Sequence, residues 1–135
     1  MRFMVLVKAT RDSEAGALPD AKLLAAMGEF NAALAQSGVL PAGDGLQPSS
    51  KGARVRFSGS KRTVIDSPFV ETKDLVAGHW LWQVKSKDEA IERVKRASFE
   101  GAEVEIRQVF EAPDFGAEFT PELREQEARL RASRK

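Results

Sequence analysis

The sequence is most informative at residues 79–84, which read His-Trp-Leu-Trp-Gln-Val. Large apolar side chains recur at every second position, and a period of two is typical of a β-strand. The residues that share the face directed to the core are Trp80, Trp82 and Val84. The residues that share the opposite face are His79, Leu81 and Gln83. We therefore expect a strand with one fully apolar face and one mixed face.

A helix is predicted directly after this strand. Ser86 and Glu89 have the spacing of a capping box, which marks a helix N-terminus. The apolar residues that follow recur every three or four positions and form one buried stripe. They are Ala90, Ile91, Val94 and Ala97. The next segment, residues 103–107, alternates between charged and apolar side chains and predicts a further strand.

The N-terminal half repeats this order of elements. Residues 3–7 are continuously apolar, which indicates a central strand buried on both faces. A helix over residues 19–37 follows from the spacing of Leu23, Met27, Phe30 and Leu34. The prolines and glycines of residues 39–52 indicate a loop. Residues 54–57 and 63–65 then form a hairpin around a turn at 58–60.

The chain divides into a domain over residues 1–110 and a C-terminal tail over residues 111–135. Within the tail, Thr120 and Pro121 are typical of the N-cap and first position of a helix, which we expect over residues 121–133. Its apolar content is essentially Leu123 and Leu130, seven residues apart. A helix with so few apolar side chains either lies loosely on the body or docks on a partner subunit.

These elements predict an α+β fold with a ferredoxin-like protomer. Two amphipathic helices cover one face of a four- or five-stranded antiparallel sheet, but the strand at residues 3–7 is apolar on both faces. The second face therefore needs a cover. A second copy of the same sheet would supply it, because two-fold symmetric homodimers are the commonest oligomers.

Composition excludes several classes of function. The chain has no cysteine, which rules out disulfides, thiolate nucleophiles and Cys-ligated metal centres. His79 is the single histidine, so we expect no structural metal, and a haem would have only this axial ligand. The formal net charge of +1 predicts no general affinity for nucleic acid, and no apolar run is long enough to span a membrane. We expect a cytoplasmic protein without a cofactor.

The segment Asp66-Ser67-Pro68-Phe69-Val70-Glu71-Thr72-Lys73-Asp74 resembles the D-G-P-F-x-E-x-K-E motif of the YCII-related family, also called the DGPF domain family. The resemblance extends over nearly the whole chain and implies a dimeric α+β barrel. Ser67 departs from the motif glycine, so the turn differs in detail. The family also implies a catalytic pair of an early histidine and an aspartate. No histidine precedes His79, so this pair is not carried over.

The candidate site combines the motif with the mixed sheet face. The predicted catalytic residues are His79, Asp66 and Glu71. The predicted ligand-binding residues are Lys73, Glu105, Arg107 and Phe69. Histidine titrates near neutral pH and suits a proton shuttle, whereas a desolvated carboxylate suits a general base.

Each of these side chains also has a structural interpretation. Asp66 would cap the turn, Phe69 would close the edge of the core, His79 would be a half-buried polar group, and Glu105 with Arg107 would take part in a cross-strand ion pair.

Two functions follow from these residues. One is a cofactor-free lyase or isomerase that moves a proton in a small acidic, enolic or aromatic molecule. The other is a non-catalytic small-molecule-binding or regulatory protein, which the family resemblance connects with sigma-factor systems. Both expect a homodimer and a small-molecule ligand as partners, and neither expects nucleic acid or a membrane.

Overall fold

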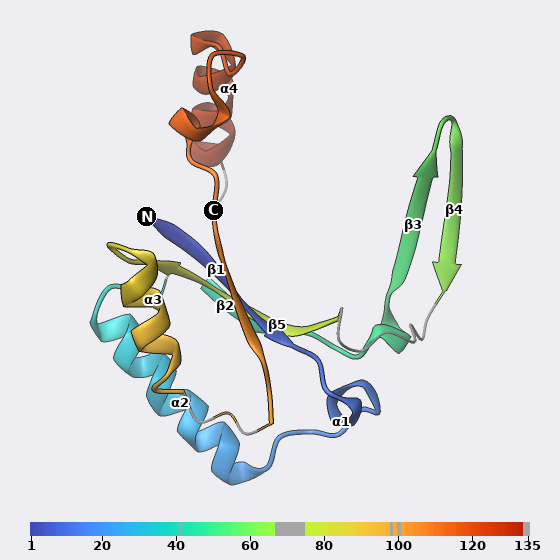
Figure 1. The fold of residues 1–135 in the computed structure, drawn as a ribbon, viewed down its shortest axis with the longest axis vertical. Helices are drawn as coiled ribbons and strands as arrows, with labels where there is room; N and C mark the ends of the chain where they lie inside the picture. The colour runs from blue at the N-terminus through green and yellow to red at the C-terminus, as the bar shows by residue number, and fades with distance from the viewer. Residues whose placement is uncertain (41, 67–74, 98, 100, 134–135) are drawn as a thin grey trace.

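The computed structural model describes residues 1–40, 42–66, 75–97, 99 and 101–133 (Figure 1). Its main sheet has the antiparallel strand order β2-β5-β1-β6. The strands are β1 (Arg2–Lys8), β2 (Ala42–Gly45), β5 (Val76–Gln83) and β6 (Val104–Gln108). Helices α2 (Ala21–Gln36) and α3 (Lys87–Val94) lie together on one side of this sheet. The order β1-α2-β2 followed by β5-α3-β6 is ferredoxin-like, as predicted.

The core lies between the sheet and the two helices. Its buried side chains are Phe3, Val5, Leu34, Val39, Trp80, Trp82, Val84 and Ala90. Four aromatic rings meet there, because Trp80 lies 5.6 Å from Phe30, 5.7 Å from Trp82 and 6.0 Å from Phe99 between ring centroids. The predicted core face of the strand at residues 79–84 is therefore confirmed, and β1 is a central strand of the sheet.

Strand β2 corrects the prediction that residues 39–52 form only a loop. Residues 42–45, Ala-Gly-Asp-Gly, pair with β5 and form one edge of the sheet. A methyl group built on Gly43 would overlap Cδ1 of Trp80 and lie 3.2 Å from its Nε1. Glycine is therefore the residue that lets this strand approach the Trp80 ring. The same glycines that indicate a loop in the sequence are required here for strand packing.

The predicted hairpin forms, but it stands outside the main sheet. Strands β3 (Ala53–Ser58) and β4 (Lys61–Asp66) make a separate two-stranded sheet. Gly59 in the connecting turn has a φ of 58°, a conformation that glycine adopts at little cost. Figure 1 shows this hairpin projecting from the body, beyond the end of the main sheet. It adds no strand to the surface that the helices cover.

Local hydrogen bonds set the helix boundaries. Asp20 accepts a hydrogen bond from the Leu23 N–H at 2.8 Å and caps α2. Ser86 accepts one from the Glu89 N–H at 3.1 Å, as predicted for α3. The Glu89 carboxylate reaches the Lys85 N–H instead of the Ser86 N–H, so the capping box is displaced by one residue. This hydrogen bond and the neighbouring Arg93 lower the pKa of Glu89. A short helix that the sequence did not predict, α1 (Arg11–Glu14), precedes α2.

The tail helix is present at the predicted position. After the short 3-10 turns η1 (Ser49–Lys51) and η3 (Ala112–Phe115), helix α4 (Pro121–Ser133) ends the described chain. Arg2 and Glu111 fix the start of the tail to β1 by two hydrogen bonds of 2.8 and 3.1 Å. The hydrogen bonds from Arg2 lower the pKa of Glu111 despite the opposing effect of burial. Beyond this ion pair, α4 extends away from the sheet (Figure 1).

Candidate functional site

A row of polar side chains crosses the sheet on the face opposite the helices. In the strand register, His79 of β5 pairs with Asp44 of β2 on one side and with Leu6 of β1 on the other. Leu6 in turn pairs with Glu105 of β6. Directly paired residues of antiparallel strands point to the same face, so these four side chains form one row. We call this the open-face row.

His79 and Asp44 form one end of the row. Side chains of directly paired residues lie close enough to interact, with Cβ atoms about 4.5–5.5 Å apart. His79 is half-buried and Asp44 is exposed on the edge strand. A methyl group on the neighbouring Gly78 would lie 3.2 Å from the Asp44 carbonyl oxygen, so a small residue permits the close pairing of β2 and β5 at this point. The register of β1 and β5 also shifts just before His79. Such bulges often occur beside functional residues because they redirect a side chain.

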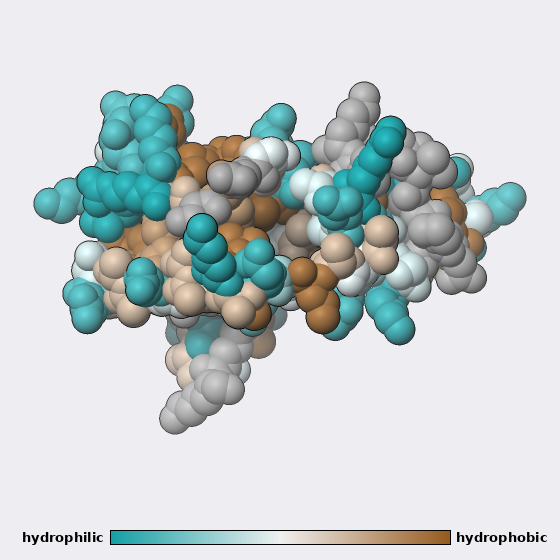
Figure 2. Space-filling view, turned by 90° about the horizontal axis from the view of Figure 1, so that it is seen from below, coloured by the Kyte–Doolittle hydropathy of each residue, from teal (hydrophilic) through white to brown (hydrophobic). Residues whose placement is uncertain are grey.

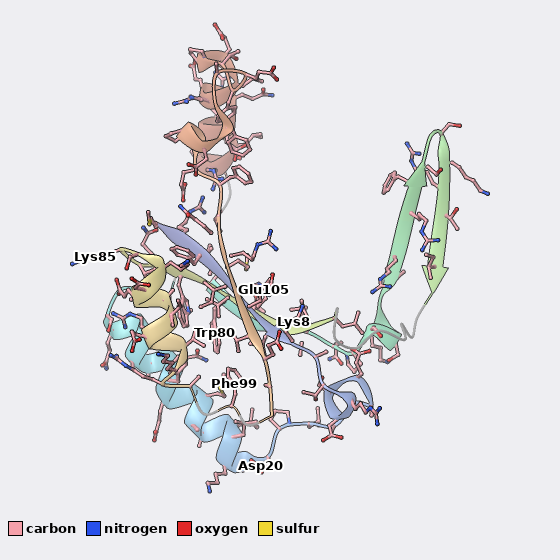
Figure 3. All side chains as sticks on the ribbon, in the orientation of Figure 1. Lys8, Asp20, Trp80, Lys85, Phe99 and Glu105 are labelled. Carbon is pink, nitrogen blue, oxygen red and sulfur yellow. The ribbon has the colours of Figure 1, made fainter. Side chains whose placement is uncertain are left out.

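Glu105 lies at the other end of the row between two cations. Its carboxylate is 3.1 Å from Arg107 Nη1 and 3.8 Å from Lys8 Nζ. Lys8 is the more protected cation, with 20% of its side chain exposed against 71% for Arg107. Lys8 and Glu105 lie beside each other in Figure 3, away from Trp80 and Phe99. Glu105 and Arg107 therefore form an ion pair within β6, and the predicted cross-strand ion pair joins Glu105 to Lys8 instead.

Apolar side chains separate the two charged ends. Met4, Leu6 and Leu81 occupy this face by strand alternation, and each is half-buried. Two carboxylates, two amino or guanidinium groups and one imidazole thus border an apolar strip. This arrangement suits a small flat molecule that has an anionic or enolic oxygen at one end.

A small cavity lies on the other side of the same strands. It has a volume of about 230 Å³ and is bordered by α2, by β2 including Asp44, and by Gly78, His79, Trp80 and Phe99. The Trp80 indole N–H donates a hydrogen bond of 2.9 Å to Asn31 Oδ1 at its wall. Ligand pockets usually measure about 300–1,000 Å³, so this cavity is small for a ligand. Strand alternation directs the side chains of His79 and Asp44 away from the Trp80 side, so we assign the chemistry to the open face.

Comparison with known proteins identifies the fold family. A family model, the YCII-related domain, matches residues 1–113. This chain belongs to the YCII-related family. The matched segment of the YCII-related domain contains the whole sheet, both covering helices and the open-face row, and it ends within η3. The family resemblance predicted from the sequence is confirmed.

One solved structure similar to this YCII-related protein is 5-chloro-2-hydroxyhydroquinone dehydrochlorinase from Burkholderia phenoliruptrix AC1100, in complex with 2,5-dihydroxybenzoquinone. The sequence identity is 16%, and the TM-score is 0.40. The similarity covers 82% of this chain and 96% of that one. No curated protein matches the chain.

Only part of the predicted site of this YCII-related domain can be placed. His79, Glu105 and Arg107 share the open face, as expected from their strand positions. Asp66 is the last residue of β4 and pairs with Ala53 in the hairpin. Phe69, Glu71 and Lys73 lie outside the described residues, so their predicted roles stay predictions.

Sequence reasoning missed Asp44 and Lys8. Asp44 lay within the predicted loop, although a polar residue between two glycines is compatible with an edge strand. Lys8 continues the alternation of β1 past the apolar run and could have been assigned to the same face as Met4 and Leu6. Both residues become candidates only when the strand register is known.

The described part of the chain contains no helix long and apolar enough to cross a bilayer. Within the same residues, no group of three or more acidic or histidine side chains is arranged to hold a metal ion.

Proposed function

We propose that this protein binds a small acidic or enolic molecule on the open sheet face and transfers a proton within it, as a cofactor-free lyase or isomerase. The observation that carries the proposal is the register that pairs His79, the single histidine of the chain, with Asp44. A carboxylate beside an imidazole can accept a hydrogen bond from one ring nitrogen. The other nitrogen is then oriented to accept or donate a proton.

The proposed chemistry assigns a role to each end of the row. Lys8 and Arg107 attract the anionic oxygen of the ligand, and Glu105 holds the two cations in position. His79 removes a proton from a carbon next to the carbonyl group, and the resulting enolate oxygen is stabilised by the cations. His79 then returns the proton to another carbon, or a leaving group departs with the electron pair. Asp44 maintains the orientation of the imidazole throughout.

A binding protein without catalysis is the second candidate. It is favoured by the Lys8–Glu105–Arg107 group, in which two cations share one carboxylate and could bind an anion without any proton transfer. Regulation through a bound small molecule would need no turnover. The two candidate functions differ in the role of Asp44. Proton transfer requires Asp44 to orient the His79 imidazole, whereas anion binding by Lys8 and Arg107 does not.

We further propose that two copies of the chain pair through their open sheet faces. Met4, Leu6 and Leu81 form an apolar strip on this face, which the helices of the same chain do not cover. A second sheet packed on it would bury the strip and enclose the polar row between two sheets. Enclosure would exclude water from the site, and electrostatic interactions are stronger where water is excluded. Sedimentation velocity at micromolar concentration should show a dimer, and a monomer there would contradict this proposal.

Hydrogen exchange in the ligand tests the proton transfer. Small 2-oxo acids and hydroxylated aromatic acids are incubated with the protein in D₂O, and loss of their C–H signals is followed by proton NMR. The imidazole signals of His79 are observed in the same spectra and need no assignment, because the chain has one histidine. For a ligand that binds, these signals should move, and exchange should be faster than in its absence.

Variants separate catalysis from binding. His79→Gln should slow the exchange by about 100-fold or more, since a positioned acid or base typically contributes 10²–10⁴-fold. Asp44→Asn should slow it while binding persists, and Asp88→Asn, an exposed acid on α3, is the matched control. Gly45→Ala adds a methyl group on the cavity side and should have no effect on either property. Binding without exchange would favour the regulatory candidate, and binding that survives Lys8→Met with Arg107→Met would reject the site.

A further inference from the structure

The cavity between the sheet and α2 has no part in the chemistry proposed for the open face. Trp80 and Phe99 form its aromatic wall, with ring centroids 6.0 Å apart. Figure 3 shows both side chains on the side of the sheet that α2 covers. Val7 and Met27 add aliphatic surface. The lining is therefore mostly apolar and suits a flat molecule that packs on aromatic rings.

Glycines form another wall of this cavity. Gly43, Gly45 and Gly78 line it, and strand alternation puts Gly43 and Gly45 on the same side of β2 as Trp80. A methyl group on Gly43 would overlap the Trp80 ring, whereas one on Gly45 would meet no heavy atom within 4 Å. The β2 backbone thus lies against the indole at Gly43 and leaves open space in front of Gly45. This space is the part of the cavity that a ligand ring would occupy.

The cavity is accessible from solvent. Met27, Asn31 and Phe99 are half-buried, and Gly43 and Gly45 lie on the exposed edge strand. Figure 2 views the molecule from the end at which α2 begins, where apolar side chains, coloured brown, reach the surface between hydrophilic ones. A small apolar molecule can therefore enter without unfolding of the core.

Asn31 supplies one hydrogen-bond donor to the cavity. Its Oδ1 accepts the hydrogen bond from the Trp80 indole N–H, which fixes the orientation of the amide. Within the described part of the chain, the Nδ2 group of Asn31 donates no hydrogen bond. An amide NH₂ group at the wall of an apolar cavity is available to a carbonyl or hydroxyl oxygen of a ligand.

The cavity and the open face differ in charge. The described residues that line the cavity include no lysine or arginine. Asp44 and His79 border it, but strand alternation directs their side chains to the open face. An anion would lose its hydration in the cavity without gaining a cationic partner, and this loss is costly. The cavity lining therefore favours a neutral molecule, whereas the open face offers Lys8 and Arg107 to an anion.

We propose that this cavity is a second binding site, which takes a neutral molecule of one six-membered ring with a carbonyl or hydroxyl oxygen directed at Asn31. An apolar cavity of about 150 Å³ can hold benzene, so a volume of about 230 Å³ has room for a ring with one small substituent. Larger ligands are excluded by size. Binding in this cavity does not depend on the proton transfer proposed for the open face.

Titration with benzamide and with benzoate tests the site. The two molecules have the same ring and nearly the same shape, but benzoate is negatively charged at neutral pH. NMR of the full-length nitrogen-15-labelled chain follows the amide N–H signals of Gly45 and Gly78 and the indole N–H signal of Trp80. Benzamide should shift these signals to saturation, and benzoate should bind there about tenfold more weakly or less. Unshifted signals with benzamide, or equal affinity for benzoate, would overturn the proposal.

Two variants of β2 place the ligand on one side of the strand. Gly45 does not have a positive φ, so Gly45→Val fills the open space without backbone strain. It should lower the affinity for benzamide by about tenfold or more, because the ring and the new side chain compete for the same volume. Ala42→Val is the matched control, since Ala42 pairs with Leu81 on the open face, and it should leave this affinity unchanged. Circular dichroism confirms that both variants are folded.

Asn31→Asp gives an independent measure. The variant keeps an oxygen that accepts the Trp80 indole N–H and removes the NH₂ donor. The affinity for benzamide should fall by about two- to tenfold, the usual contribution of one hydrogen bond. Unchanged affinity in Asn31→Asp or in folded Gly45→Val would reject the site.

The double variant Lys8→Met with Arg107→Met separates this site from the open face. It should bind benzamide as tightly as the parent chain does, because neither cation lines the cavity. Loss of benzamide binding in this variant would mean that the ligand lies on the open face, and would overturn the second site.

Discussion

Gly43 provides a stringent test of the packing that supports the site. It lies on β2 opposite Trp80, and a side chain at this position would point at the indole ring. A methyl group there would overlap Trp80 Cδ1 and lie 3.3 Å from the His79 carbonyl oxygen. The ring cannot easily move away, because Trp80 packs on Phe30 and Trp82 as well. Gly43→Ala should therefore strain the core.

The magnitude can be worked out against a matched control on the same strand. A methyl group on Gly45 would have no heavy atom within 4 Å. Both substitutions lower the conformational entropy of the unfolded chain to the same extent. This effect alone stabilises the folded state by about 0.4–1 kcal/mol. Overpacking typically costs about 1–3 kcal/mol, and only Gly43→Ala incurs this cost. The difference in the free energy of unfolding between the two variants should thus be about 1–3 kcal/mol. For 135 residues it corresponds to about 4–11 °C in Tm.

Urea unfolding followed by tryptophan fluorescence measures this difference directly, since both tryptophans of the chain lie in the core. Gly45→Ala should unfold at the same urea concentration as the parent chain or slightly higher, and Gly43→Ala at a lower one. Equal midpoints for the two variants would refute the argument. They would mean that β2 does not lie against Trp80 in solution.

Three further predictions concern the body, the tail and the hairpin. Asn31→Leu removes the acceptor of the Trp80 indole N–H and should lower the free energy of unfolding by about 1–2 kcal/mol in the same urea assay. The pKa of Glu111 is lowered by Arg2, so its ion pair stabilises the folded chain above pH of about 4.5 and is lost as the pH falls through the lowered value. The difference in stability between the parent and Glu111→Gln, at most about 1 kcal/mol for this exposed pair, should accordingly vanish between about pH 5 and pH 3. The basic hairpin should give no gel shift with duplex DNA at physiological salt, and salt-sensitive binding would contradict this expectation.

The ferredoxin-like body was predictable because its signals are local and repeated. Alternation at residues 79–84 assigned the strand, and it also assigned Trp80 and Trp82 to the core. The helical stripe that ends at Leu34 was equally clear. In each case the side chains that define the period are large, so their burial dominates the energetics of the segment. The choice of face follows directly from such a pattern.

Edge strand β2 was not predictable in the same way. Its pairing with β5 depends on the absence of a side chain at Gly43, and a missing side chain produces no periodic signal. Asp44 was overlooked for the same reason, since its proximity to His79 exists only through a pairing between distant parts of the chain. The position of the hairpin outside the main sheet also depends on long-range packing, although its own turn and strands were clear from the sequence.

The open-face row also explains how a sheet-to-sheet dimer could tolerate charged groups in its interface. Burying an unpaired charge is costly, whereas a charge that retains its partners costs much less. Glu105 already has Lys8 and Arg107 as partners, and Arg107 is exposed enough to remain at a rim. Asp44 lies on the edge strand β2, where water can still reach it. Asp44, Glu105 and Arg107 therefore lie on the two edge strands, whereas His79 and Lys8 lie on the inner strands beside the apolar strip of Met4, Leu6 and Leu81. A ligand held over this strip would meet His79 at one end and the two cations, Lys8 and Arg107, at the other. The proposed proton transfer needs this arrangement, because His79 moves the proton and the cations stabilise the enolate oxygen.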